Sequence, residues 1–252
     1  MGALSVVVPS YNEEDRLPPS LREISHFLAE RRHWHPAELI VVDDGSGDQT
    51  AAAARAVSVP PGIRLEVLTH RENRGKGAAV RTGFRHATGD QILLSDADLS
   101  APIEELETLA RSGPETTVRI GSRALNRELI TVRQPIYRDL MGRIFNLAVR
   151  TLVLPGIFDT QCGFKLFPGD LGRSLAAVQS IEGFAFDVEL MYLARRWGTP
   201  VVEVPVHWRH VEASRVQPGR HSLEMLKDLF RLWLRGLGGR LPAPPRPPDT
   251  AR

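Results

Sequence analysis

The chain has 252 residues, of which 42% are apolar and 25% charged, so it can bury the core of an α/β domain and has the composition of a globular protein. Its one cysteine, Cys162, excludes an internal disulfide framework and suits a reducing cytoplasm. No apolar stretch approaches the roughly 18–20 residues that cross a bilayer, and the first residues lack the pattern of a signal peptide. We therefore predict a cytoplasmic protein with no membrane-spanning helix and no nucleic-acid partner.

The net charge of +2 is unevenly distributed along the chain. Residues 1–126 carry 14 basic and 18 acidic side chains, a net charge of −4, whereas residues 127–252 carry 18 and 12, a net charge of +6. Ordinary solvated surface charge can produce this difference. It also fits an acidic half that holds a metal and a nucleotide, and a basic half that contacts an anionic surface or acceptor.

The first half of the chain alternates between two patterns. Short β-branched runs closed by turn residues predict buried strands over Leu4–Val8, Glu38–Val42, Leu65–Leu68 and Gln91–Leu94. Helical patterns lie between them, over Leu17–Arg31, Gln49–Val57 and Gly77–Ala87. This alternation predicts an α/β fold with a doubly wound, mostly parallel sheet, in which ligands bind at the carboxyl ends of the strands.

Beyond about residue 127 the pattern changes. Two amphipathic helices with interleaved arginines are predicted over Ile136–Leu154 and Ser222–Leu237, and a strand over Val201–Val206. The apolar faces of these helices either pack against the sheet or form an interface, and the sequence leaves both open. Proline-rich Pro242–Arg252 predicts disorder. The expected organisation is therefore one α/β domain over residues 1–216, a helical extension over 217–240 and a disordered tail over 241–252.

Two carboxylates, Asp96 and Asp98, follow the strand Gln91–Leu94 and are separated by Ala97. Such a pair at a strand end can share a hard divalent cation and leave the remaining coordination positions to diphosphate oxygens and water. An isolated pair with this spacing more often forms a turn that caps a helix. Because other strand ends here are acidic as well, we predict a metal site.

Asp43 and Asp44 follow the strand Glu38–Val42. A carboxylate there can accept a hydrogen bond from a uracil N–H or a ribose hydroxyl, although a plain Asp-Gly turn is the simpler interpretation. Two adjacent acids repel each other, which favours a functional role. The stretch 73–77, Asn-Arg-Gly-Lys-Gly, precedes a helix and could hold phosphate, with Lys76 as one of its two cations.

Two later stretches place polar groups among aromatic residues: 159–165, Asp-Thr-Gln-Cys-Gly-Phe-Lys, and 184–189, Phe-Ala-Phe-Asp-Val-Glu. A position at the edge of the hydrophobic core would account for the composition of both stretches, and we expect Cys162 to be an inert core residue. The second stretch supplies two carboxylates, Asp187 and Glu189, which are the candidates if the reaction uses a base and which otherwise orient a sugar or an arginine.

Taken in this order, the stretches VPSYNEEDRLP, VVDDGSGDQT, NRGKGAAVRTG, SDADLSAPIEE, GSR, DTQCGFKLF, GFAFDVELMYLARRWG and EVPVHWRHVEASRV resemble the family 2 glycosyltransferases. Within that family they look most like the polyprenyl-phosphate glycosyltransferases, in particular the dolichyl-phosphate β-glucosyltransferase branch and its bacterial undecaprenyl-phosphate counterparts. The similarity covers residues 4 to about 216 and implies the GT-A fold, with its nucleotide-sugar site at the carboxyl ends of the strands.

The resemblance also implies roles for individual residues. The nucleotide sugar would be held by Pro9, Tyr11, Glu13, Asp43, Asp44, Lys76, Asp96, Ala97 and Arg123. Asp96 and Asp98 would bind Mg²⁺ or Mn²⁺, and phosphates of the donor or acceptor would contact Arg123, Arg209 and Arg215. Some relatives use a glutamine at the metal where this chain has Ser100, so a metal ligand is not expected there.

The expected reaction is an inverting transfer of glucose from UDP-glucose to dolichyl or undecaprenyl phosphate. A phosphate acceptor is largely ionised at neutral pH and needs little help from a base such as Asp187 or Glu189. Such a substrate implies peripheral contact with the cytoplasmic face of a membrane. Three alternatives remain: a GDP-mannose-dependent mannosyltransferase, the same fold acting on a soluble acceptor, and a catalytically silent nucleotide-binding module. A homodimer is also left open.

Overall fold

The structure is a computed structural model that describes residues 2–132, 135–211, 218–239 and 241–244. The strands are β1 (Leu4–Ser10), β2 (Ala37–Asp43), β3 (Ile63–Thr69), β4 (Gln91–Leu94), β5 (Val118–Ser122), β6 (Ile130–Val132), β7 (Lys165–Pro168), β8 (Val201–Pro205) and β9 (Trp208–Arg209). The α-helices are α1 (Leu17–Ala29), α2 (Thr50–Arg55), α3 (Lys76–His86), α4 (Glu105–Arg111), α5 (Ile136–Leu152), α6 (Gly169–Val178), α7 (Phe186–Arg196) and α8 (Pro218–Leu237).

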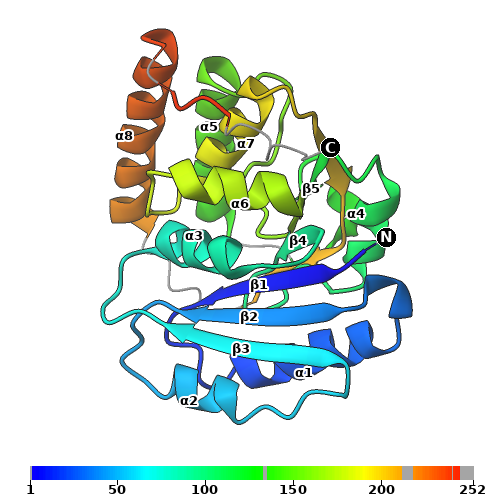
Figure 1. Ribbon diagram of the computed structural model, residues 1–252. Helices are drawn as coiled ribbons and strands as arrows, with labels where there is room; N and C mark the ends of the chain where they lie inside the picture. The colour runs from blue at the N-terminus through cyan, green and yellow to red at the C-terminus, as the bar shows by residue number, and fades with distance from the viewer. Residues whose placement is uncertain (1, 133–134, 212–217, 240, 245–252) are drawn as a thin grey trace.

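Seven strands form one central sheet in the order β3-β2-β1-β4-β7-β5-β8 (Figure 1). Strands β3, β2, β1 and β4 are parallel to one another, and β5 is parallel to β8. Only β7 runs against its neighbours in this sheet, β4 and β5. The doubly wound, mostly parallel sheet expected from the sequence is therefore confirmed.

Alternate side chains of the central strands enter two separate hydrophobic cores. On β1, Val6 and Val8 join a core that is covered by α1, α2 and α4. Val7, between them, joins a second core formed with helices α3 and α5 to α8. Because both faces of these strands are buried, their sequences are continuous apolar runs without polar alternation.

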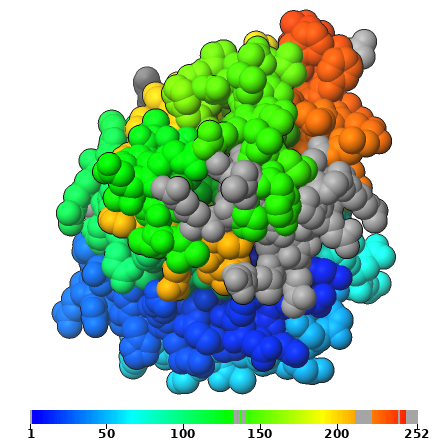
Figure 2. Space-filling model, turned by 180° about the vertical axis from the view of Figure 1, so that it is seen from behind, coloured from blue at the N-terminus to red at the C-terminus, as the bar shows by residue number. Residues whose placement is uncertain are grey.

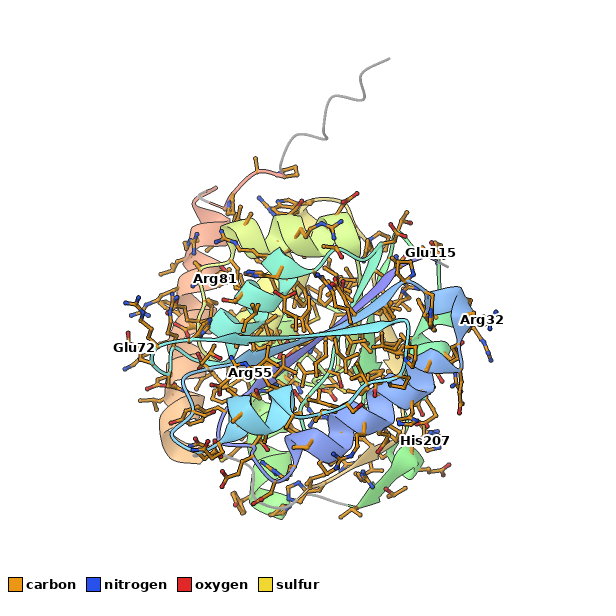
Figure 3. All side chains as sticks on the ribbon, turned by 60° about the horizontal axis from the view of Figure 1, so that its bottom comes forward. Arg32, Arg55, Glu72, Arg81, Glu115 and His207 are labelled. Atoms are coloured by element: carbon orange, nitrogen blue, oxygen red, sulfur yellow. The ribbon has the colours of Figure 1, made fainter. Side chains whose placement is uncertain are left out.

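All carboxyl ends of β1 to β4 lie at one edge of the sheet, which is called here the carboxyl edge. Glu72, in the loop after β3, lies on this side of the molecule, whereas Arg32 and Glu115, which precede β2 and β5, lie on the opposite side (Figure 3). The antiparallel strand β7 begins at the carboxyl edge, because Lys165 pairs in register with Leu94, the last residue of β4. The segment 159–164 therefore reaches the same edge as the strand ends.

The four strands predicted in the first half are present with nearly the predicted limits, and so are the three helices between them. Helix α8 begins at Pro218, earlier than the predicted Ser222, and α5 ends at Leu152. At the start of the predicted disordered tail, the Pro242 carbonyl accepts a hydrogen bond from Trp197 Nε1 at 3.1 Å; residues 245–252 lie outside the described part of the chain. None of the described helices is long and apolar enough to span a bilayer.

Candidate active site

Asp96 lies at the centre of the carboxyl edge, two residues after the end of β4. Its Oδ1 is 2.5 Å from Nζ of Lys76, the first residue of α3. Its carboxylate also lies against the backbone of Gly163, so closely that a Cβ added to Gly163 would be 1.9 Å from Oδ2. Burial opposes ionisation, but the ammonium of Lys76 outweighs it and holds the pKa of Asp96 below its usual value. Lys76 and Asp96, both predicted to bind the nucleotide sugar, are thus in contact, and the Asp96 carboxylate also contacts Gly163 of the 159–165 stretch.

Asp98 lies in a tight turn two residues further on. One of its oxygens accepts a hydrogen bond from the backbone N–H of Ser100 at 2.9 Å. Leu99, between them, has φ of 46°, a left-handed conformation that is uncommon for any residue but glycine. Burial and the neighbouring charge of Asp96 raise the pKa of Asp98, so the two carboxylates repel each other in the absence of a cation.

These residues fit a divalent cation that is shared with a ligand. Within the described part of the chain, no group of three or more His, Cys, Asp and Glu side chains could hold a metal ion. Asp96 and Asp98 supply two carboxylates, which is the number of protein ligands that Mg²⁺ commonly uses when substrate phosphates and water complete its coordination. The repulsion between the two carboxylates is the feature that a bound cation would relieve. Buried Ala97 separates them and offers no donor side chain.

Asp43 and Asp44, at the end of β2, are both buried and both engaged by neighbouring loops. Asp43 accepts hydrogen bonds from the hydroxyl and the backbone N–H of Ser46. Asp44 accepts from the backbone N–H groups of Arg74 and Gly75, the latter at 2.7 Å, and lies 2.7 Å from Nδ1 of His70. Asp44 therefore anchors the loop that carries Lys76, a role that the sequence did not reveal.

The residues predicted to hold the nucleoside on β1 lie beside this pair. Pro9 is within the strand, and Tyr11, 37% exposed, follows its end. The backbone N–H of Glu13 donates to the hydroxyl of Thr50 at 2.7 Å, and its carboxylate binds Arg16 through two hydrogen bonds. The turns after β1 and β2 are thus tied together.

Arg123, directly after β5, is held by a residue that sequence reasoning missed. Asp159 accepts hydrogen bonds from its Nε at 2.7 Å, its Nη2 at 2.8 Å and its backbone N–H at 2.9 Å. This partner raises the pKa of the guanidinium despite burial, and the guanidinium also lies 5.2 Å from the ring centre of Trp208. The proximity of Asp159 to a strand end could have been inferred only if β7 had been recognised as antiparallel.

Of the other predicted phosphate contacts, Arg209 is exposed in β9, and its backbone N–H donates to the Ser100 carbonyl at 2.8 Å. The turn after Asp98 is thereby joined to the segment around Arg209. Arg215 lies outside the residues that the structure describes.

The two candidate bases on α7 have different surroundings. Asp187 is buried with Oδ1 2.9 Å from Nζ of fully buried Lys165, and burial raises the pKa of Asp187 in spite of this partner. Glu189 is also buried, and both its oxygens accept hydrogen bonds from the backbone and side chain of Ser180 and the backbone of Ile181. Asp187 thus pairs with the ammonium group of Lys165, whereas the hydrogen bonds of Glu189 hold the loop before α7.

With this geometry in place, the class of protein follows from a comparison with known families. Residues 5–167 match the model of the family "Glycosyl transferase family 2". This match covers more than half of the chain, so the protein belongs to glycosyltransferase family 2 and is a glycosyltransferase. The resemblance noted in the sequence is confirmed.

Two similar proteins are described as glucosyltransferases that act on dolichyl phosphate. "Dolichyl-phosphate beta-glucosyltransferase" of Homo sapiens is 40% identical over 248 residues, which cover 94% of this chain and 76% of the relative. The protein of the same description from Saccharomyces cerevisiae is 36% identical over 246 residues, covering 90% and 72%.

Solved structures confirm the GT-A fold. Glucosyl-3-phosphoglycerate synthase from Mycobacterium tuberculosis, in complex with Mn²⁺, UDP-glucose and glycerol 3-phosphate, has a TM-score of 0.60 at 22% identity and covers 97% of this chain and 82% of its own. Mannosyl-3-phosphoglycerate synthase from Rubrobacter xylanophilus has a TM-score of 0.66 at 19% identity, covering 96% and 76%. Their donors and acceptors differ, so the fold alone does not choose a substrate.

Proposed function

We propose that this glycosyltransferase transfers glucose from UDP-glucose to a polyprenyl phosphate, dolichyl or undecaprenyl, with inversion at the anomeric carbon and with a bound Mg²⁺ or Mn²⁺. The observation that carries the proposal is the similarity to dolichyl-phosphate glucosyltransferases over 94% of the chain. The carboxylate pair Asp96 and Asp98, with Lys76 beside it, supports a site for a metal-bound diphosphate.

In this proposal Asp96 and Asp98 hold the cation at the carboxyl edge, where its charge would stabilise the departing UDP. Lys76 reaches Asp96 from the first turn of α3 and adds a second positive charge near the diphosphate. The N-terminus of α3 contributes a further favourable dipole for an anion.

The acceptor supplies its own nucleophile. A phosphate monoester has a second pKa near 6, so its oxygen is largely ionised at neutral pH and a general base contributes little. Asp187, paired with Lys165, then serves to orient the charges around Lys76 and Asp96. Glu189 is not part of the reaction in this proposal, because both its oxygens are occupied by the loop at residues 180 and 181.

A lipid acceptor requires that the protein meet a membrane surface, and α5 and α8 are suited to that. The two helices pack against each other, and Figure 2 shows them on one face of the molecule, coloured green and orange. Each exposes a stripe of large apolar side chains that are 42–68% accessible: Tyr137, Leu140, Ile144 and Leu147 on α5, and Leu223, Leu226, Phe230, Leu234 and Leu237 on α8. Apolar patches of this extent mark interaction sites.

Charge favours an anionic lipid surface as the partner of this face. The sequences of α5 and α8 contain seven lysines and arginines and three acidic residues, a net charge of +4. In a symmetric homodimer the same patch would meet itself, which brings like charges together. A cytoplasmic leaflet is negative and attracts basic helices, with about 1 kcal/mol for each lysine or arginine near the surface.

Vesicle flotation with Phe230→Asp tests this part of the proposal. Phe230 is 52% exposed, so about 100 Å² of its surface, worth about 2.5 kcal/mol, is available for burial in lipid. We expect binding to phosphatidylglycerol vesicles at least about tenfold weaker for Phe230→Asp than for the matched control Leu125→Asp, whose leucine is 45% exposed outside these helices. Wild-type protein that does not float with anionic vesicles at low salt, or that is a dimer through this face, would contradict it.

A donor and acceptor matrix tests the reaction itself. UDP-glucose and GDP-mannose are each offered with dolichyl phosphate, undecaprenyl phosphate and 3-phosphoglycerate, and products are separated by thin-layer chromatography. The proposal requires a glucosylated lipid from UDP-glucose. Mannosyl lipid as the main product, or transfer to 3-phosphoglycerate alone, would assign a different substrate, and no turnover of any donor would favour a nucleotide-binding module.

A further inference from the structure

The position of Lys76 depends on the backbone on both sides of it. Lys76 is the first residue of α3, preceded by Gly75 with φ of 110° and followed by Gly77. Asp44 holds this stretch from the side of the sheet by accepting the N–H of Gly75 at 2.7 Å. A second segment, residues 179–184, also contacts this stretch and is called here the bracing loop.

The bracing loop contacts the main chain around Lys76 directly. A Cβ added to Gly75 would lie 2.4 Å from the carbonyl oxygen of Glu182, and one added to Gly77 would lie 2.5 Å from that of Ile181. The Glu182 carbonyl accepts the N–H of Ala78 at 3.2 Å. Gln179 Nε2 donates to the Gly77 carbonyl at 2.8 Å. The bracing loop thus leaves no room for a side chain at Gly75 or Gly77, the two residues that flank Lys76 in the sequence.

The side chain of Glu182 strengthens this contact. Its Oε1 accepts hydrogen bonds from Arg74 Nη2, at 2.6 Å, and from Arg81 Nη2. Burial opposes ionisation of Glu182, but these two arginines lower its pKa, so the carboxylate is charged at neutral pH. Arg74 precedes Lys76 by two residues and Arg81 follows it by five, so one carboxylate fixes α3 on both sides of Lys76.

We propose that Glu182 is a positioning residue for the donor site, which holds the first turn of α3 so that the ammonium of Lys76 stays beside Asp96 and the metal-bound diphosphate. This inference rests on the proposed function, because it assumes that the ligand of the site is a nucleoside diphosphate with a divalent cation. Glu182 itself acts through the loop that carries Lys76.

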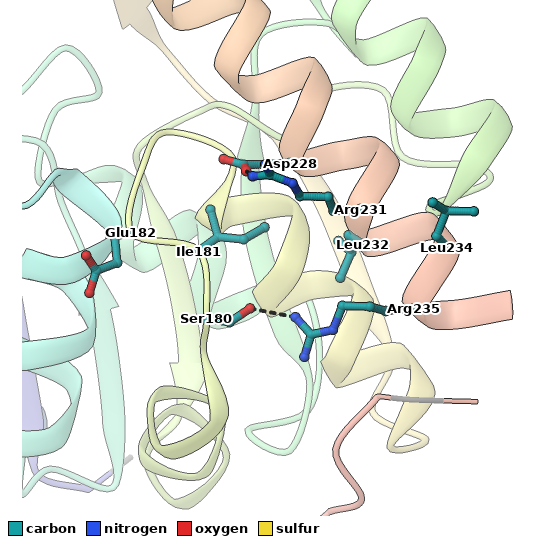
Figure 4. Close-up of a pocket in the computed structure, with 8 residues that line it drawn as sticks. All are labelled: Ser180, Ile181, Glu182, Asp228, Arg231, Leu232, Leu234 and Arg235. Carbon is teal, nitrogen blue, oxygen red and sulfur yellow. Dashed lines mark hydrogen bonds and ion pairs between the residues drawn. The ribbon is translucent and has the colours of Figure 1, made fainter. Parts of the chain in front are cut away.

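The far side of the bracing loop is attached to α8. Arg235 on α8 donates from Nη1 to the hydroxyl of Ser180 at 2.8 Å (Figure 4), and the same hydroxyl donates to Glu189 at 2.6 Å. A hollow of about 610 Å³ lies between the loop and the helix, lined by Ile181, Leu232 and other residues of both elements. The bracing loop thus joins α8, the helix with the exposed apolar stripe, to the first turn of α3.

Calorimetric titration of UDP in the presence of Mn²⁺ tests the proposal with the full-length chain. Glu182 is 39% exposed, so Glu182→Gln should fold normally and weaken UDP binding about three- to fivefold, the value of a partly screened ion pair. Arg235→Ala should weaken binding in the same direction. The matched control is Asp170→Asn, which removes a carboxylate 2.6 Å from Arg173 on α6 and should leave the affinity unchanged.

Steady-state kinetics supply a second readout. Glu182→Gln should raise KM for the nucleotide sugar and leave kcat at saturating donor within about twofold of the wild type, with an unchanged melting temperature. Equal UDP affinity of the wild type and Glu182→Gln would overturn the positioning role, and equal affinity of Arg235→Ala would remove α8 from it. Wild-type protein that does not bind UDP with Mn²⁺ would instead overturn the proposed function.

Discussion

Gly163 is far from Asp96 in the sequence, but we expect Gly163→Ala to displace the Asp96 carboxylate and so to impair metal binding. The added Cβ would lie 1.9 Å from Oδ2, 2.2 Å from Cγ and 2.4 Å from Oδ1 of Asp96. Ordinary carbon–oxygen contact requires about 3.4 Å, so Oδ2 of Asp96 must move away by about 1.5 Å. Metal–oxygen distances tolerate only about 0.2 Å, and a displacement of about 1 Å at a reacting group costs about 100-fold in rate.

The carboxylate of Asp96 is the end of a side chain and can rotate away, so the cost should fall on metal binding more than on folding. We expect Gly163→Ala to keep its melting temperature within a few degrees and to lose about 100-fold in Mn²⁺-dependent transfer. Gly113→Ala is the matched control, because the nearest side-chain atoms to a Cβ there, those of Thr117, are 4.0 Å away. Equal activity and equal Mn²⁺ affinity of Gly163→Ala and the wild type would refute the placement of Asp96 in the metal site.

Three further predictions follow from single side chains. Asp98→Ala should reduce transfer by more than about 100-fold with little change in the circular dichroism spectrum, because a metal ligand is lost; activity close to wild type would contradict this. Burial opposes ionisation of Glu38, but hydrogen bonds, including one from Arg64, lower the pKa of this carboxyl. The charged carboxylate therefore stabilises the fold above pH about 4.5, and this stabilisation is lost as the pH falls below that value. Glu38→Gln should lower the free energy of unfolding in urea by about 1–3 kcal/mol and flatten its pH dependence. Burial raises the pKa of Cys162 to about 12, so this thiol should react with Ellman's reagent at pH 8 only after unfolding, and rapid labelling of the native protein would show that it is accessible.

The positions of the main strands could be predicted because both faces of these strands are buried. Continuous apolar runs such as Val6–Val8 mark them, and the acidic residues after each run mark the carboxyl edge. The contact between Lys76 and Asp96 was not predicted, because β3 and β4 are separated in the sheet by β2 and β1 and Lys76 reaches Asp96 from the start of α3.

Other parts of the fold could not be predicted from periodicity. Strand β5 contains Arg119, which is 1% exposed and donates to the side chain of Gln91, and a buried arginine breaks an apolar pattern. Strand β7 has four residues, begins with buried Lys165 and ends with a proline, so nothing local identifies it as a strand.

The roles of the carboxylates were the least accessible to sequence reasoning. A sequence shows that Asp44 and Glu189 lie near a site, but not where their oxygens point. In the structure Asp44 binds the backbone of Gly75, and Glu189 binds the backbone of Ser180. Both serve loops that meet around Lys76, because the antiparallel strand β7 and helix α7 bring distant segments to the carboxyl edge.

In the proposed reaction, Asp96 and Asp98 hold a cation that supports glucosyl transfer to a lipid phosphate. The most direct measurement follows radiolabelled glucose from UDP-glucose into the organic phase with undecaprenyl phosphate, for the wild type with Mn²⁺, the wild type with EDTA, and Asp98→Ala with Mn²⁺. We expect labelled lipid in the first reaction, its loss with EDTA and recovery with excess Mn²⁺, and about 1% or less with Asp98→Ala. Transfer within about threefold of the wild type in the EDTA or Asp98→Ala reaction would contradict it.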